Sequence, residues 1–506
     1  MKRTWKAVAA CAAALVLGAC SAGSGGLGAG GGGQTDELKV GTFLDLTSWD
    51  PAKADIGFDG PYLSAVYDPL VALNDKSQPI PALATQWSYS PDGLTLTMKL
   101  RTGVTFDDGK PFDADAAVVN LEHLKNGVRS SDAYQDVTSI TKVDNDTIAL
   151  HLKQRDDTLL YFMGLGRSWM ASPAAIESGS LDKGPDGSGP YTYEVGQSTP
   201  GSKYVFTKKK NYWDSATYPF STVRLMPITD QTASLNAMLS GQLNVDYANP
   251  ADTPKAQQNN WNVASGVATW VGLQFVDRAG QHVPALGDVR VRQAINYAFD
   301  SAAMLHSIGN NAGELTNQLF PVGDPAYNPA LNSRYAYNLS KAKQLMAEAG
   351  YAHGFSVTMP MATMFQVWQP AVEQTFHQLG IDVKWDNMSP ADYQKNAPTY
   401  PLFIAVVAMD SNMMATVKRQ ITEPQWYNPD PAIESQPEMA RLVQTAQATT
   451  GQAQVDAVRQ LNAQLIEKAY NAVWYQANNT YFSVHGIKVT PITGTMFPPL
   501  RFIQRG

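Results

Sequence analysis

Histidine and cysteine are among the side chains in this sequence that could bind a metal or act as nucleophiles, and the spacing of the histidines argues against a local metal site. No two histidines have the three- or four-residue spacing of a helical metal site. No G-x-S-x-G, H-E-x-x-H or Walker A sequence occurs either. We therefore predict no catalytic residue, no metal site and no cofactor, although distant histidines could still assemble a nickel or zinc site. The histidines are His123, His151, His282, His306, His353, His377 and His485.

The adjacent carboxylates Asp107 and Asp108 could form an acid–base pair for catalysis. They stand directly before Gly109, and an Asp-Gly sequence is typical of a turn in which the aspartate side chain accepts a backbone hydrogen bond. We therefore interpret this pair as turn-capping residues.

Asp410 has the strongest case for contacting a ligand. It follows an apolar run, Pro401 to Met409, whose continuous hydrophobicity predicts a strand buried on both faces. A carboxylate at the end of such a strand is partly desolvated, which is unfavourable unless a cation pairs with it. A ligand ammonium group would be one such cation, and internal pairing with Arg419 or Arg167 is the alternative.

The N-terminus has the organisation of an export signal. Three basic residues precede the apolar run Ala7 to Leu17, which is too short to span a bilayer. Leu17-Gly18-Ala19-Cys20 then resembles a bacterial lipobox, in which the cysteine is lipidated. We predict a signal peptide over residues 1–19, lipidation of Cys20, and attachment to the outer face of the cytoplasmic membrane. A Cys11–Cys20 disulfide is disfavoured because Cys11 lies inside the apolar signal segment.

Residues 20–35 are predicted to be a lipidated cysteine followed by a flexible tether. Ser21 to Gln34 consists mostly of Gly, Ala and Ser and cannot bury a core. It contains a G-x-G-x-x-G sequence, Gly28 to Gly33, but no strand precedes it and no helix follows, so the dinucleotide-site interpretation fails. The formal net charge of −7 makes nucleic acid a poor partner, although ordinary solubility explains this charge equally well.

The elements that would position these residues alternate between strands and helices over 506 residues, a length that suggests about three domains. Leu94 to Leu100 alternates apolar and polar residues, as a half-buried strand does. Asp113 is placed to N-cap a helix whose Ala117, Leu121 and Leu124 share a face. Further strands are expected at 38–43, 148–152, 204–206, 223–225, 271–276, 380–385 and 401–409, and further helices at 230–239, 288–298, 340–348, 371–379 and 454–467. This alternation predicts an α/β fold.

A series of short motifs runs along the chain. YDPLV, PALATQW and LRTGVTFDDGKPFDADAAV lie within 67–118, and GSGPY (187–191), NYWD (211–214), SGQLNVDYA (240–248), DVRVRQAINYAFD (288–300) and NLSKAKQLMAEAGY (338–351) follow. In this order they resemble the family 5 extracellular solute-binding proteins, which are the peptide, nickel and opine receptors of ABC importers. The resemblance covers nearly all of residues 38–500, with Asp107 where the family usually has histidine.

That resemblance implies a two-lobed type II periplasmic-binding-protein fold with an extra domain inserted in lobe I. In such a fold the chain starts in lobe I, passes through the extra domain, returns to lobe I, builds lobe II and ends in lobe I. The expected ranges are 36–63 for the first part of lobe I, 64–185 for the extra domain, 186–266 for the second part of lobe I, 267–479 for lobe II and 480–506 for the return to lobe I.

The resemblance also implies a function. The protein would be a receptor and not an enzyme, capturing a small organic solute by lobe closure and delivering it to an ABC-importer permease. An oligopeptide is the first candidate for the solute, and an oligosaccharide or a metal chelate is the alternative. The protein would be a monomer held at the membrane by its lipid anchor. A hydrolase exported from the cell, using paired carboxylates, is the alternative class.

The resemblance finally implies where the solute binds. Peptide receptors of the family often place an aspartate at the end of the strand that precedes Asp410, although Val407-Ala408-Met409 replaces the usual Gly-Trp here. Trp169 and Trp426 lie in segments that face the cleft in relatives, where ligand stacking and core packing are equally open. Met413 could form a pliable apolar wall or simply pack. The other candidates are Arg167, from an apolar segment, and Asp55 and Phe58, from an irregular one.

Overall fold

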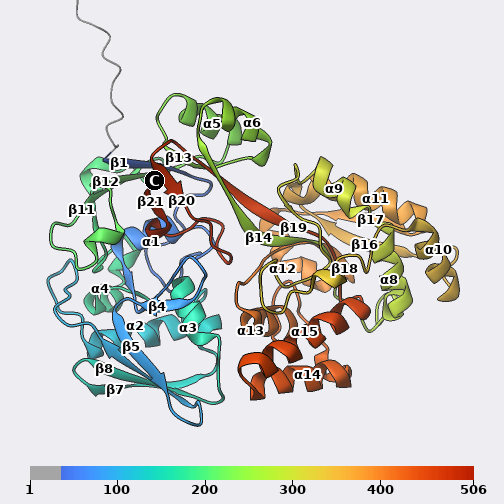
Figure 1. Cartoon of the computed structure of the whole chain (residues 1–506), viewed down its shortest axis with the longest axis horizontal. Helices are drawn as coiled ribbons and strands as arrows, with labels where there is room; N and C mark the ends of the chain where they lie inside the picture. Colours follow the sequence, from blue (N-terminus) through green and yellow to red (C-terminus); the bar gives the residue numbers. More distant parts are fainter. Residues whose placement is uncertain (1–35) are drawn as a thin grey trace, which may run out of the picture. The chain divides into compact units, whose positions relative to one another are not determined.

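A mixed nine-stranded β-sheet forms the centre of residues 36–506, the range that the computed structural model describes (Figure 1). Its strand order is β10-β11-β12-β1-β13-β19-β14-β18, with β15 paired to β19. The strands are β1 (Glu37–Thr42), β10 (Tyr191–Tyr193), β11 (Tyr204–Lys208), β12 (Thr222–Pro227), β13 (Val245–Tyr247), β14 (Asn262–Phe275), β15 (Gly313–Glu314), β18 (Leu402–Ala408) and β19 (Asn471–Ser483). The predicted signal peptide, Cys20 and the tether lie outside the described residues.

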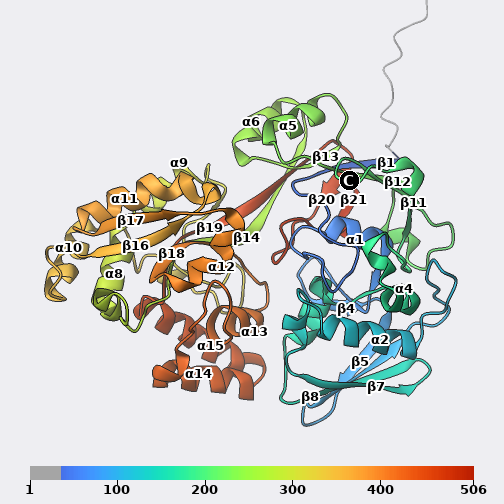
Figure 2. The same cartoon turned by 180° about the vertical axis from the view of Figure 1, so that it is seen from behind.

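Two long strands, β14 and β19, carry this sheet from one half of the described chain to the other (Figures 1 and 2). The first half of β14 pairs with the end of β19, next to β13, whereas its second half also pairs with β18. The β14–β19 register shifts between Val267 and Thr269. We call residues 267–479 lobe II and the other described residues lobe I, so the chain passes between the lobes within these two strands.

An antiparallel four-stranded sheet, in the order β5-β6-β8-β7, forms a separate layer of lobe I. Helix α2 lies across it (Figure 2). Asp113 caps this helix as predicted, because its carboxylate accepts a hydrogen bond from the Ala116 N–H at 3.0 Å. The helix buries Ala117, Leu121 and Leu124 against the sheet. The elements are β5 (Ala84–Tyr89), β6 (Thr95–Leu100), β7 (Val137–Asp144), β8 (Thr147–Leu152) and α2 (Ala114–Lys125).

The predicted strand at Leu94 begins one residue later in the structure. β6 buries Leu96, Met98 and Leu100, as the alternation indicates, but Leu94 precedes the strand and is 37% exposed. Its N–H still belongs to the preceding turn, where it donates to the Asp92 carboxylate at 3.0 Å. The turn therefore delays the start of the strand.

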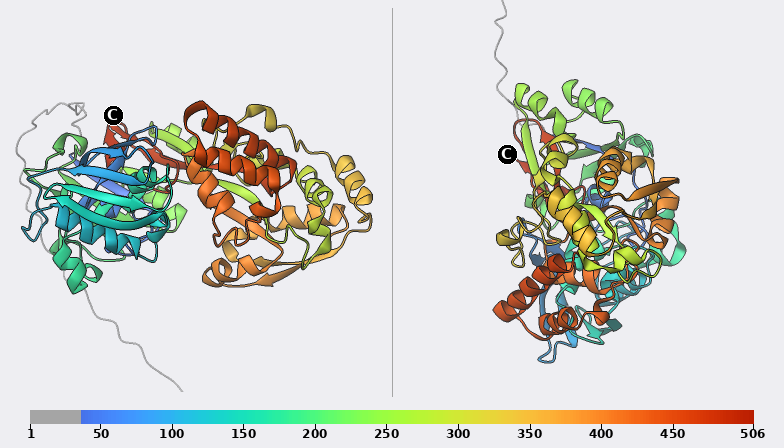
Figure 3. Two further views of the ribbon diagram at one scale, coloured as in Figure 1. Left: turned by 90° about the horizontal axis from the view of Figure 1, so that it is seen from below. Right: turned by 90° about the vertical axis from the view of Figure 1, so that its right-hand side faces the viewer.

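Lobe II packs its helices around β14, β18 and β19 and buries its own hydrophobic core. Asp288 caps α8 through the Arg290 N–H, and Val291 and Ile295 are buried as predicted. Helices α14 and α15 lie side by side (Figure 3). The elements are α8 (Val289–Ala298), α10 (Leu339–Glu348), α11 (Gln369–Gln378), α14 (Pro437–Ala448), α15 (Gly451–Glu467) and the parallel pair β16 (Ser356–Met361) and β17 (Asp382–Asn387). Within the described range, no helix has both the length and the apolar composition to cross a membrane.

Three of the sequence motifs meet at one buried carboxylate in lobe I. Asp68, in β2 (Asp68–Pro69), accepts hydrogen bonds from Tyr212 at 2.5 Å, Ser188 at 2.7 Å and Trp213 at 3.3 Å. Burial raises the pKa of Asp68 to about 6 although the three donors oppose this shift. The motifs YDPLV, GSGPY and NYWD therefore share a structural role.

Candidate functional site

A cleft of about 380 Å³ lies between the two lobes. Lobe I contributes residues 54–57, residues from the segment 128–132, Arg167 and Gly494 to its walls. Lobe II contributes Gln394, Ala408, Arg419 and residues 425–427. Clefts of this size are typical of small-molecule sites. A solute bound here would contact both lobes at once.

Three of the seven predicted ligand residues, Asp55, Arg167 and Trp426, line this cleft. Asp55 pairs with Arg129 at 2.8 Å, and its other oxygen accepts the Gly57 N–H at 2.9 Å. The Trp426 ring stacks on Phe403, with the ring centres 6.2 Å apart. Packing in lobe II thus holds this indole at the cleft wall.

Arg167 reaches the cleft from an irregular helical turn after α3 (Leu159–Phe162). Gly166, just before it, has a φ of 118°, and a Cβ atom there would come within 3.2 Å of the Trp169 indole nitrogen. The Arg167 guanidinium donates through Nε and Nη2 to the two Asp132 oxygens, at 2.8 and 3.0 Å. Burial opposes the charge of Asp132, but Arg167 holds the pKa of this carboxyl below its ordinary value.

Asp410 is fully buried directly after β18 and is not among the residues that line the cleft. Its Oδ1 accepts a hydrogen bond from Arg419 Nη1 at 3.0 Å, which is one of the internal pairs weighed from the sequence. Asp410 Oδ2 has no hydrogen-bond donor among the residues that the structure describes. Burial raises the pKa of Asp410 above its ordinary value, against the opposing charge of Arg419. Asp410 thus adjoins two lining residues, Ala408 and Arg419, without reaching the surface of the cleft.

The other three predicted residues do not line the cleft. Trp169, in β9 (Trp169–Met170), is 5% exposed in the core of lobe I. Phe58 packs beside Phe43, with ring centres 6.4 Å apart. Met413, the first residue of α13 (Met413–Thr416), packs against the core of lobe II. Of the two roles weighed for Trp169 and Met413, packing is the one with contacts in this structure.

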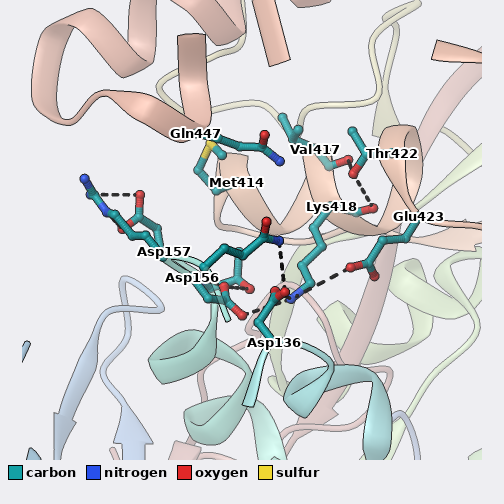
Figure 4. Close-up of a pocket in the computed structure, with 12 residues that line it drawn as sticks. Asp136, Asp156, Asp157, Met414, Val417, Lys418, Thr422, Glu423 and Gln447 are labelled. Atoms are coloured by element: carbon teal, nitrogen blue, oxygen red, sulfur yellow. Dashed lines mark hydrogen bonds and ion pairs between the residues drawn. The ribbon is translucent and has the colours of Figure 1, made fainter. Parts of the chain in front are cut away.

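A second contact between the lobes, which sequence reasoning missed, lies beside a cavity of about 150 Å³ (Figure 4). Lys418 of lobe II points toward two carboxylates of lobe I, and its Nζ lies 2.9 Å from both Asp136 and Asp156. The Lys418 side chain is only 11% exposed. Lys418 and Asp156 are 262 positions apart, so no local pattern could have brought them together. We call Lys418, Asp136 and Asp156 the interlobe triad.

The charges of the interlobe triad shift the pKa of Lys418 itself and of the neighbouring Glu423. Burial opposes the charge of Lys418, but the neighbouring carboxylates raise its pKa above the ordinary value. Burial, together with Asp136 and Asp156, raises the pKa of Glu423 to about 7, although Lys418 lies 3.9 Å away and opposes the shift. The triad is thus a charged link between the lobes with little contact to solvent.

The adjacent carboxylates Asp107 and Asp108 both bind groups of the protein itself. Asp108 accepts hydrogen bonds from the Lys110 N–H at 2.9 Å and from Ser172 Oγ at 2.7 Å, and Asp107 pairs with Lys209 at 2.7 Å. Asp108 therefore caps the turn, as interpreted from the sequence. Across residues 36–506, no three His, Cys, Asp or Glu side chains are grouped so that they could hold a metal ion.

Comparison with protein families gives one match that covers most of the chain. Residues 78–426 match the model for the bacterial extracellular solute-binding proteins, family 5, middle region. Among curated proteins, the glutathione-binding protein GsiB of Escherichia coli O1:K1 / APEC is 25% identical over 352 residues, which are 68% of this chain and 67% of GsiB.

Two solved structures show the same fold. DppA from Helicobacter pylori, in complex with the peptide STSA, has a TM-score of 0.77 and 20% identity, covering 93% of this chain and 98% of DppA. NikA from Brucella suis, in complex with Fe(III)-EDTA, has a TM-score of 0.78 and 19% identity, covering 93% of this chain and 100% of NikA. These likenesses confirm the predicted type II periplasmic-binding-protein fold.

Proposed function

Because this chain belongs to the family 5 bacterial extracellular solute-binding proteins, we propose that it captures a small organic solute, in the first place an oligopeptide, in the cleft between its lobes. It is a substrate-binding protein of an ABC transporter and not an enzyme, which excludes the exported hydrolase weighed from the sequence. The observation that carries the proposal is the cleft of about 380 Å³ with walls from both lobes.

The names of the relatives order the candidate solutes. GsiB is a glutathione-binding protein and DppA is solved with a peptide, which supports an oligopeptide. NikA is solved with Fe(III)-EDTA, which supports a metal chelate as the second candidate, and an oligosaccharide is the third. Expression without residues 1–20, followed by mass spectrometry of the compound that co-purifies, tests this order. A peptide mass supports the first candidate, and a sugar or chelate mass replaces it.

Within the cleft we propose ligand contacts for Asp55, Arg167 and Trp426, which line it. Asp410 is proposed to accept a ligand ammonium group through Oδ2, the oxygen that has no hydrogen-bond donor among the residues that the structure describes. Trp426 offers an aromatic face suited to peptides and sugars alike. Charged groups on both walls and an aromatic ring on the lobe II wall fit a solute with both polar and apolar parts.

We expect the solute to close the lobes, since it gains contacts from both only when they come together. β14 and β19 would act as the hinge because they connect the lobes, with a register irregularity in β14 at Val267–Thr269. Small-angle X-ray scattering with and without the co-purified compound should show a smaller radius of gyration in the bound state. Identical profiles at saturation would contradict closure.

Cys20 is proposed to attach the protein to the outer face of the cytoplasmic membrane, where a permease would receive the solute from a monomeric receptor. Cys20→Ala should leave the chain unprocessed or release it from the membrane, because lipidation supplies the anchor. Membrane fractionation and the mass of the mature chain measure this outcome. An alanine variant that is processed and fractionates like the wild type would show that Cys20 is not the anchor.

A further inference from the structure

A further cavity, of about 110 Å³, lies in lobe II and is lined by three cations and by no acidic side chain. The cations of this basic cavity are Arg278, Arg292 and Lys468. In β14, Thr269 pairs with Ala408, which lines the interlobe cleft. Phe275, at the other end of the strand, accepts a hydrogen bond from Arg278 at 2.5 Å through its carbonyl. The strand from Thr269 to Phe275 spans about 20 Å, so the basic cavity is separate from the cleft.

Arg292 carries a buried charge that no carboxylate balances, since it is only 7% exposed and donates only to backbone carbonyl oxygens. The acceptors are the carbonyls of Arg278, Leu286, Gly287, Lys468 and Ala469. The last two follow the final turn of α15, where carbonyl groups favour a cation but carry only partial charge. Burial and the neighbouring charge of Arg278 lower the pKa of Arg292 to about 10. The two guanidinium groups repel each other, so an anion near both would stabilise them.

Arg278 and Lys468 present unused donors to the same cavity. The Arg278 guanidinium lies over the Tyr470 ring, 4.0 Å from its centre, and its Nη1 and Nη2 donate to uncharged acceptors. These acceptors are the backbone carbonyls of Phe275 and Asp430 and the side-chain amide oxygen of Asn428. Arg278 Nε and the exposed Lys468 ammonium have no acceptor among residues 36–506. Both groups can therefore donate to a ligand in the cavity.

Nearby carboxylates do not cancel this positive charge. Six acidic residues lie in the flanking segments, and none of them lines the cavity. Four are engaged elsewhere, namely Asp277 by the N–H groups of residues 281–283, and Asp288, Glu438 and Glu467 by Arg290, Arg441 and Arg334. The other two, Asp430 and Glu434, are exposed. The three lining cations outnumber these two carboxylates, so an anion is favoured in the cavity.

The first turn of α14 adds backbone donors beside these cations. This helix begins at Pro437, and Gln436 and Met439 line the cavity. Gln436, the N-cap residue, makes no side-chain cap, so the N–H groups of Glu438 and Met439 have no acceptor within the helix. The positive end of a helix dipole favours an anion. The helix end thus adds to the positive field of the arginines and Lys468.

We propose that the basic cavity binds a small oxyanion of the phosphate or sulfate type, in contact with Arg278, Lys468 and the first turn of α14. A tetrahedral oxyanion has acceptors in several directions, which matches donors from a guanidinium, an ammonium group and backbone N–H groups. The cavity has room for several water-sized groups but is smaller than the cleft of about 380 Å³, which suits an ion better than a peptide. This site goes beyond the proposed function, because its occupation does not depend on the transported solute.

Calorimetric titration of the full-length chain in mild detergent, with sodium phosphate and with sodium sulfate, tests this site. Sodium chloride keeps the ionic strength constant, so a difference in screening cannot account for the result. We expect phosphate to bind at low millimolar concentrations and to raise the melting temperature. Phosphate and sulfate also stabilise proteins through exclusion from the surface, so the comparison among variants decides where they bind.

Two variants remove cations from the basic cavity. Lys468→Gln removes an exposed ammonium group and should weaken phosphate binding roughly 5-fold. Arg278→Gln removes the guanidinium over Tyr470 and should weaken it roughly 10- to 100-fold. The matched control, Lys343→Gln on the exposed side of α10, lies outside the cavity and should bind phosphate as the wild type does. Because Lys468 is exposed, its variant keeps the test valid even where Arg278→Gln does not fold.

Weaker binding in Lys468→Gln and Arg278→Gln, with wild-type affinity in Lys343→Gln, supports the site. Unchanged affinity in both cavity variants would place the phosphate elsewhere, for example at the arginines of the cleft, and overturn the inference. An equal loss in Lys343→Gln would indicate non-specific attraction and overturn it as well. A wild type that binds neither phosphate nor sulfate overturns it directly. None of these outcomes bears on solute capture in the cleft, which mass spectrometry of the co-purified compound tests separately.

Discussion

Replacing Lys418 with methionine is expected to weaken solute binding by roughly 100-fold, because it removes the cation of the interlobe triad. Methionine keeps much of the apolar volume but leaves Asp136 and Asp156, which are 6% and 3% exposed, facing each other. Removing one partner of a buried ion pair costs about 3–5 kcal/mol. We take the lower end because Lys153 lies 3.4 Å from Asp136 and compensates in part. This cost arises when the lobes meet, so it reduces the affinity of any solute that closes them.

Calorimetry with the co-purified compound measures this effect. Lys395→Met, on the exposed side of α12 (Pro390–Asn396), is the matched control and should bind as the wild type does. Adding Asp136→Asn and Asp156→Asn to Lys418→Met should restore part of the affinity, because neither position then carries a buried charge without its cation. Wild-type affinity in Lys418→Met itself would mean that the triad does not stabilise the bound state.

Asp410→Asn is expected to weaken binding of a tripeptide with a free amino terminus by roughly 30-fold or more, as when one member of a buried charge pair is truncated. Asp410 Oδ2 has no donor within the described chain, and a ligand ammonium group would supply one through a charge-assisted hydrogen bond. Calorimetry and thermal unfolding should be measured on the same variant, since Asp410 also pairs with Arg419.

An N-acetylated tripeptide is the control for this prediction. It carries no ammonium group, so its affinity should hardly change between the wild type and Asp410→Asn. A lower melting temperature with unchanged affinity for both peptides would instead assign Asp410 to the scaffold, as the partner of Arg419 within lobe II. Asp410 is fully buried. The variant therefore distinguishes a role in ligand binding from a role in the scaffold.

Elements that depend on contacts within a few residues could be predicted from the sequence. Asp113 and Asp288 cap α2 and α8 because an N-cap needs only a side chain next to the first free N–H groups. The period of two in β6 and the continuous apolar run of β18 likewise indicate how many faces each strand buries. The order of the motifs then identified the family, and the family implied the two-lobed fold. Residue patterns alone identified neither.

Elements that depend on distant partners were only partly predictable. The sequence predicts a strand at 271–276, whereas β14 begins at Asn262, because its first half pairs with the end of β19 more than 200 positions later. This half contains Asn, Ser and Gly, whose preference for strands is weak, and tertiary pairing overrides it. The convergence of three motifs on Asp68 also became visible only in the fold.

The charged residues of the cleft and of the interlobe triad were likewise only partly predictable. Of the seven candidates chosen from the residues and from the family resemblance, Asp55, Arg167 and Trp426 line the cleft and the other four do not. Only the tertiary structure paired Arg167 with Asp132 and Lys418 with two carboxylates of the other lobe. Residue type determines which groups can carry charge, but the strength of an ion pair depends on distance and burial. Both are set by how the lobes pack, so the chemistry of the cleft could be read only from the folded chain.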